Sequence, residues 1–147
     1  EKFREKDWFV LINNLVQNKK DFKKSDWYHH AKKSIYSSGV FIYKKLYIKN
    51  LSELDIFFSE YLIPLIDSLS ENGWDSKISD EIPTGMIGRD GSLIKSGNGC
   101  HRLAILQSVN NNFKYPMRIV AIHPKINTAS DLPDYIIKLL KSINYPI

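Results

Sequence analysis

The residues most suited to chemistry form the hexapeptide Gly97-Asn98-Gly99-Cys100-His101-Arg102, which contains the only cysteine of the chain. Glycine tolerates positive φ, so a Gly-x-Gly turn lets the backbone approach a ligand closely. The run Leu103-Ala104-Ile105-Leu106-Gln107 follows at once and predicts a helix. The first amides of a helix have no partner within it and carry partial positive charge. The spacing therefore predicts an anion-binding site, and these residue types suggest that the anion is a phosphate.

The polar side chains in and beside the hexapeptide fit such chemistry. Arg102 can hold a phosphate through two parallel hydrogen bonds, and His101 can donate to a phosphate oxygen or carry a proton. Cys100 is a candidate nucleophile, because positive charge at a helix start favours the thiolate. Asn98 stabilises the loop or contacts a ligand, and Lys95 reaches a phosphate or stays in solvent. An ordinary turn with a small buried cysteine is the alternative for the whole segment.

The segment from Ile82 to Ile122 resembles the ParB/sulfiredoxin-like superfamily. The resemblance covers roughly residues 40–125 and follows the order of an I-x-R-D-G-x-L hairpin, a G-x-G-x-H-R loop, a helix and a P-x-x-I-V strand. The tetrapeptide Gly99-Cys100-His101-Arg102 is similar to the GCHR signature of sulfiredoxins. In that group the loop binds ATP phosphates and the cysteine takes part in reducing a sulfinic acid. Other members of the superfamily bind CTP or act as small-molecule kinases.

The resemblance implies a nucleotide-dependent phosphoryl-transfer enzyme that uses ATP or CTP with Mg²⁺, and a small molecule or a protein group as acceptor. It makes His101 and Arg102 the main catalytic candidates, with Cys100 as a further one. The implied nucleotide ligands are Lys95, Gly97, Asn98, Gly99, Cys100, His101 and Arg102. Phosphoryl transfer also needs carboxylates to accept a proton and hold the metal. The candidates are Glu53, Asp55, Asp67 and Glu71, for which a plain place on a helix surface is the alternative.

Two other functions stay open. A sulfiredoxin-like reductase would depend on Cys100, although Asn98 stands where sulfiredoxins carry a glycine. A non-catalytic module would bind nucleic acid or a protein partner through residues 1–49, which hold 12 Lys or Arg against 5 Asp or Glu. Aromatic residues interleave with these lysines, as in many polyanion-binding surfaces. A solvated lysine-rich helix face explains the same composition.

The composition limits which classes of protein this chain can belong to. A chain of 147 residues with 43% hydrophobic residues suits one domain with a real core. No run approaches the ~20 apolar residues of a membrane span, and no signal-peptide pattern opens the chain. A single cysteine forms no internal disulfide, which fits a reducing compartment. We therefore expect a cytoplasmic protein with no membrane contact. With one cysteine and four scattered histidines we also expect no structural metal site.

The elements that position the hexapeptide follow from apolar periodicity and turn residues. Asp7 and Ser52 are predicted helix N-caps, and Ser25-Asp26 opens the second predicted helix. Arg89-Asp90-Gly91 is a predicted tight turn, and His123 is a further candidate site residue after the last strand. The predicted helices cover 7–18, 25–36, 52–73 with a kink or a new start at Pro64, 101–109 and 131–142, and the predicted strands cover 40–48, 84–88, 92–96 and 116–122.

This order of elements predicts an α+β fold with a small mixed sheet. We expect a helical N-terminal extension over residues 1–38 and a ParB/sulfiredoxin-like core over residues 39–125 that carries the chemistry. A C-terminal helix within residues 126–147 is expected to pack on that core.

Overall fold

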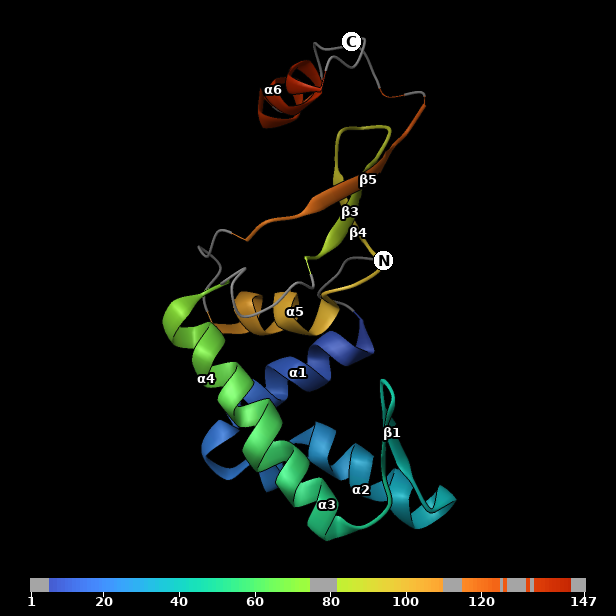
Figure 1. Cartoon of the computed structure of the whole chain (residues 1–147), viewed down its shortest axis with the longest axis vertical. Helices are drawn as coiled ribbons and strands as arrows, with labels where there is room; N and C mark the ends of the chain where they lie inside the picture. Colours follow the sequence, from blue (N-terminus) through green and yellow to red (C-terminus); the bar gives the residue numbers. More distant parts are fainter. Residues whose placement is uncertain are drawn as a thin grey trace. The chain divides into compact units, whose positions relative to one another are not determined.

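The computed structural model describes residues 6–74, 82–109, 115–124, 126, 132 and 134–143. Helices and two small sheets confirm the predicted α+β class (Figure 1). The contacts divide the chain into two compact units, each built from two separate stretches. The first unit is Glu1–Asp75 with His101–Tyr115, and the second is Ser76–Cys100 with Pro116–Ile147. The division predicted from the sequence, into residues 1–38, 39–125 and 126–147, has other boundaries than these two units and stays a prediction.

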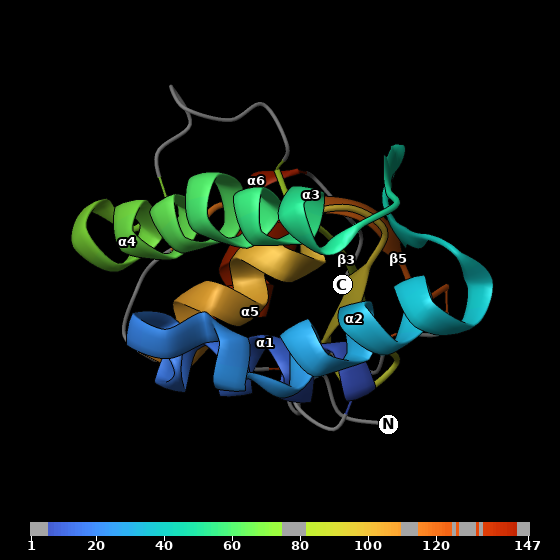
Figure 2. The same ribbon diagram turned by 90° about the horizontal axis from the view of Figure 1, so that it is seen from below.

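Helices dominate the first unit. They are α1 (Asp7–Gln17), the 3-10 segment η2 (Lys19–Lys24), α2 (Asp26–Ser38), α3 (Leu51–Ile56), the π-helical segment η3 (Phe57–Leu62), α4 (Ile63–Asn72) and α5 (Cys100–Val109). Figure 2 shows α5 between α1 and α2 on one side and the rod of α3 and α4 on the other. The middle of α5 is therefore buried in one apolar cluster that includes Ile12, Leu15, Ile35, Leu54, Phe58, Leu62, Ile66, Ala104, Ile105 and Leu106.

The starts of α1 and α2 depend on different residues. The helix predicted to open at Ser25-Asp26 begins at Asp26, and Ser25 caps it, because its hydroxyl accepts a hydrogen bond from the Tyr28 amide at 3.2 Å. The prediction for Asp7 is wrong, since Lys6 is the N-cap residue and Asp7 is already the first helical residue. A carboxylate in the first turn still interacts favourably with the positive end of the helix.

The start of α3 also differs from the prediction. Asn50, and not Ser52, is the N-cap, and its side chain accepts from the Glu53 amide at 2.9 Å. The Glu53 carboxylate in turn accepts from the Lys49 amide at 2.8 Å and from the Asn50 side-chain amide at 2.6 Å. Asn50 and Glu53 thus form a reciprocal capping box. The acidic residue three positions after Ser52 is Asp55, which instead accepts from Lys23 and Tyr28.

The helix that begins at Leu51 runs to Asn72, and its hydrogen-bonding pattern changes from α to π in the middle segment η3. Pro64 lies in the first turn of α4. Proline has no amide to donate and its ring crowds the carbonyl four residues before it. The wider π turn just before α4 is one way in which a helix adapts to such an interruption. The backbone stays right-handed helical at Ile56, Phe57, Leu62 and Ile63, so the helix is continuous and the π turn replaces the predicted new start at Pro64.

Residues 40–48 form a hairpin, and the predicted single strand is wrong. β1 (Phe41–Tyr43) and β2 (Leu46–Ile48) pair antiparallel, with Phe41 opposite Ile48. Lys44 turns the chain with a φ of 55°. Non-glycine residues adopt this left-handed conformation rarely, and the run lacks the glycine or asparagine that usually marks a tight turn.

The second unit contains the predicted mixed sheet. Its strands β3 (Thr84–Ile87), β4 (Leu93–Ser96) and β5 (Arg118–Ile122) lie in the order β4-β3-β5, with β4 antiparallel and β5 parallel to β3. Helix α6 (Asp134–Ser142) buries Ile136 and Leu140 in a second apolar cluster with Ile87. The predicted start of this helix at residue 131 lies outside the described residues.

A buried tyrosine ties α2 to α3 and makes stability depend on pH. Asp55 accepts hydrogen bonds from Lys23 Nζ at 2.6 Å and from Tyr28 Oη at 2.7 Å. Lys23 and then Tyr28 hold the pKa of the Asp55 carboxyl below its usual value, while burial and the bond to Asp55 raise the pKa of Tyr28 to about 12. The Asp55 contribution is therefore present above pH ~4 and lost as pH falls further. The Tyr28 contribution is lost as pH rises from about 10 to about 12.

We expect Asp55→Asn to destabilise the protein by no more than about 1 kcal/mol at pH 7, because the Lys23 and Asp55 side chains are 55% and 38% exposed. Urea denaturation at pH 7 and at pH 3 measures the difference from the wild type. The difference should shrink at pH 3. An equal difference at both pH values, against a Glu60→Gln control at an exposed position of the same unit, contradicts this assignment.

Candidate functional site

Two glycines shape the loop between β4 and α5. Gly97 and Gly99 have φ values of 57° and 79°, the positive values that the sequence predicts. A Cβ on Gly99 would lie 2.9 Å from the Pro83 Cα, and a Cβ on Gly97 would lie 2.5 Å from the Thr84 Oγ1. The loop therefore packs closely against the residues that open β3, and both positions require glycine.

The polar groups of this loop are organised around two carbonyls. Lys95 Nζ donates to the carbonyl of Ser96 at 2.6 Å and to that of Gly97 at 2.9 Å. The half-buried Cys100 thiol contacts the same Gly97 carbonyl at 3.2 Å, and the Thr84 hydroxyl donates to Ser96. These contacts hold the Lys95 charge at the loop, where an anion ligand would need it. They also occupy the thiol proton of Cys100 in a structural bond.

Helix α5 begins at Cys100, directly after the second glycine. Its first-turn amides have no acceptor within the helix, and its ten residues are enough for a positive N-terminal end. The division of the chain falls inside the hexapeptide, with Cys100 in the second unit and His101 in the first. The loop therefore belongs to the second unit, and the His101 and Arg102 side chains belong to the first.

His101 lies among three aromatic rings of the first unit. It stacks on Trp27, with centroids 5.9 Å apart and planes at 7°, and Tyr43 and Trp8 approach it at 5.3 Å and 6.2 Å. The rings come from α2, β1 and α1, so the helical N-terminal region forms the surroundings of a candidate site residue. The only sequence signal for this contact was the group of aromatic residues interleaved with lysines in residues 1–49.

Arg102 packs on a residue that the sequence did not indicate. Its guanidinium carbon lies 5.9 Å from the centroid of the Trp74 ring, within the range of a cation–π interaction. Arg102 Nη1 and Trp74 Nε1 are both buried, and neither has an acceptor among the residues that the structure describes. The two unsatisfied donors are the most unusual polar feature of the first unit.

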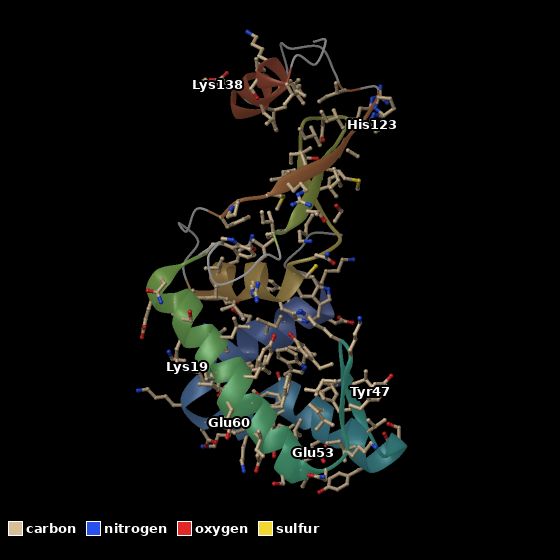
Figure 3. All side chains as sticks on the ribbon, in the orientation of Figure 1. Lys19, Tyr47, Glu53, Glu60, His123 and Lys138 are labelled. Carbon is tan, nitrogen blue, oxygen red and sulfur yellow. The ribbon has the colours of Figure 1, made fainter. Side chains whose placement is uncertain are left out.

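Three of the four carboxylates proposed for catalysis are engaged in structural contacts, and the fourth, Glu71, is exposed on α4. Both oxygens of Glu53 accept hydrogen bonds in the α3 cap, and Figure 3 places Glu53 at the end of the first unit that is remote from α5. Asp55 pairs with Lys23, and Asp67 with Lys19 at 2.7 Å. The structure thus does not bring Glu53 together with His101 or Arg102.

Asp90 and His123 lie at the same end of the sheet. Asp90 accepts from the Ser92 amide at 3.0 Å and from its hydroxyl at 2.6 Å, which lowers the pKa of the Asp90 carboxyl and fixes the turn. The His123 amide donates to the Ile87 carbonyl at 2.9 Å. Because Ile87 pairs with Leu93 at the start of β4, this end is opposite to the glycine loop after Ser96. Figure 3 marks His123 beyond β5.

The parts of the chain described by the structure contain no group of three or more His, Cys, Asp or Glu side chains that could hold a metal ion. None of the helices described is long and apolar enough to cross a membrane. Comparisons of the chain with protein families, with curated proteins and with solved structures found no match.

Proposed function

We propose that the protein binds a nucleoside triphosphate, ATP or CTP, through the hexapeptide Gly97–Arg102 and transfers its terminal phosphoryl group. The observation that carries the proposal is the loop itself. Two glycines of positive φ lead from β4 straight into the first turn of α5. A phosphate bound there would meet the amides of the first turn and the positive end of the helix. Lys95, held at the loop carbonyls, adds a full positive charge.

The order of elements supports the proposed ParB/sulfiredoxin-like relationship. The hairpin of β3 and β4, the loop, α5 and then β5, parallel to β3, follow one another as that resemblance implies. Catalysis in such a site is mostly positioning and charge neutralisation by groups such as Lys95 and Arg102. His101, held by stacking on Trp27, would donate to a phosphate oxygen in a fixed orientation.

The phosphoryl transfer breaks the bond between the terminal phosphorus and its bridging oxygen and forms a bond to an acceptor oxygen. The proposed acceptor is a hydroxyl of a small molecule or of a protein group. Its proton passes to solvent, and the nucleoside diphosphate leaves with the electron pair of the broken bond. Mg²⁺ would enter with the nucleotide, but the described residues offer it no set of carboxylate ligands. We therefore derive no step through the metal.

Calorimetric titration of MgATP and MgCTP tests the site. We expect Arg102→Ala to bind about 10- to 100-fold more weakly than the wild type, because a charged hydrogen bond contributes roughly 1.5–3 kcal/mol. Arg102→Lys keeps the charge and should lose less, which separates a binding defect from a folding defect. Equal affinity of the wild type and Arg102→Ala would remove the assigned site.

The Cys100→Ser variant is the control for the reductase alternative. Serine can make the same hydrogen bond to the Gly97 carbonyl, so this variant should bind nucleotide as the wild type does. Loss of all turnover in Cys100→Ser, with nucleotide affinity retained, would instead favour the reductase.

A further inference from the structure

Two buried hydrogen-bond donors of the first unit have no acceptor among the residues that the structure describes. They are Trp74 Nε1 and Arg102 Nη1, and the Arg102 guanidinium lies over the Trp74 ring at 5.9 Å. A buried donor that loses its water and gains no acceptor is costly, and more so when it is charged. Two such donors on neighbouring side chains point to an acceptor that is not among the described residues.

The local structure explains how these side chains meet. Gly73 ends α4 with a φ of 67° while its amide bonds to the Leu69 carbonyl at 3.1 Å. This turn places Trp74 against the main apolar cluster, where the ring is half-buried. Arg102 is the third residue of α5 and belongs to the same unit. Both side chains are therefore attached to packed helices.

We propose that Trp74 and Arg102 form a two-donor oxyanion site that binds one phosphate group of the nucleotide. The choice of the nucleotide as ligand rests on the proposed function, whereas the oxyanion site rests on the two donors. The indole ring beneath the guanidinium restricts its rotation, and the indole N–H adds a neutral donor that cannot be titrated. Trp74 is thus a binding residue for the phosphate, beside the charge of Arg102.

Nuclear magnetic resonance of the indole N–H groups tests this site directly. The chain has three tryptophans, and Trp74→Phe identifies the Trp74 resonance while keeping an aromatic ring under the guanidinium. Saturation with MgATP should move the Trp74 N–H resonance downfield, as a new hydrogen bond requires. Inorganic phosphate should move it in the same direction, and acetate serves as the carboxylate arm. In calorimetry, Trp74→Phe should bind MgATP about three- to tenfold more weakly than the wild type.

The outcomes separate this site from the proposed function. If MgATP binds the wild type and Trp74→Phe equally and the Trp74 resonance does not move, the two-donor site is overturned and the nucleotide site stands. If no nucleotide binds but inorganic phosphate or acetate moves the resonance, the oxyanion site stands and the proposed function fails. If no oxyanion moves the resonance, the two-donor site is overturned. The amide spectrum of Trp74→Phe shows in the same experiment that the variant is folded.

Discussion

Replacing Phe58 by alanine is expected to lower the free energy of unfolding of the first unit by about 3–5 kcal/mol, the range for removing a buried aromatic side chain. Phe58 is fully buried at the centre of an aromatic cluster. Its ring stacks on Phe22 at 5.6 Å and meets the edges of Tyr28 and Trp27 at 5.3 Å and 6.0 Å. The residues around the resulting cavity come from several elements and cannot all collapse into it.

Urea denaturation followed by tryptophan fluorescence measures this loss. All three tryptophans belong to the first unit, so the signal reports that unit alone. The control is Tyr36→Ala, since Tyr36 is 68% exposed on α2 and should change stability by about 0.5 kcal/mol or less. A loss below about 1.5 kcal/mol in Phe58→Ala would contradict the central position of this ring. Because Trp27 contacts both Phe58 and His101, the variant should also disturb the stacking of His101.

Gly99→Ala is expected to destabilise the second unit and to remove nucleotide binding. The left-handed conformation alone costs a non-glycine residue about 1–2 kcal/mol. The new Cβ would also lie 2.9 Å from the Cα of Pro83, a backbone atom that cannot move without shifting the start of β3. Overpacking of this kind adds about 1–3 kcal/mol. If the loop shifts to relieve this clash, it no longer presents its amides to a phosphate.

Gly39→Ala is the matched control for this variant. Gly39 has a φ of 76°, close to the 79° of Gly99, but a Cβ there would meet nothing within 4 Å. It should therefore show the conformational cost alone and retain nucleotide affinity. Amide hydrogen exchange in β3 and β4 measures the effect of Gly99→Ala on the second unit, and calorimetry measures binding. If Gly99→Ala binds MgATP within threefold of the wild type, the loop is not the phosphate site.

Local signals predicted the parts of the molecule that short-range chemistry determines. Helix α2 opens at the Ser25-Asp26 pair, the Asp90-Gly91 turn joins β3 to β4, and Gly97 and Gly99 adopt positive φ, because each depends on residues nearby in the chain. The Lys44 turn escaped prediction since lysine has no preference for its left-handed conformation. There the cross-strand pairing of Phe41–Tyr43 with Leu46–Ile48 outweighs local propensity.

The surroundings of the candidate site could not be predicted in this way. His101 meets Trp8, Trp27 and Tyr43 only after α1, α2 and β1 have packed around α5. Trp74 reaches Arg102 from the end of α4 for the same reason. Such contacts join residues that are distant in the chain, and apolar periodicity identifies the buried face of a helix without naming its partner. The residue types alone identified the hexapeptide, whereas its neighbours in space could be identified only from the folded structure.

The discontinuity of the first unit has a consequence for biosynthesis. Residues 1–75 leave the ribosome before α5, which supplies Ala104, Ile105 and Leu106 to their apolar cluster. At about 5–20 residues per second, the intervening stretch 76–100 delays that helix by a few seconds. During this interval the nascent chain exposes apolar side chains that only α5 can cover. His101 and Arg102 therefore join the first unit only after residues 76–100 have been made, whereas Gly97 to Cys100 belong to the second unit.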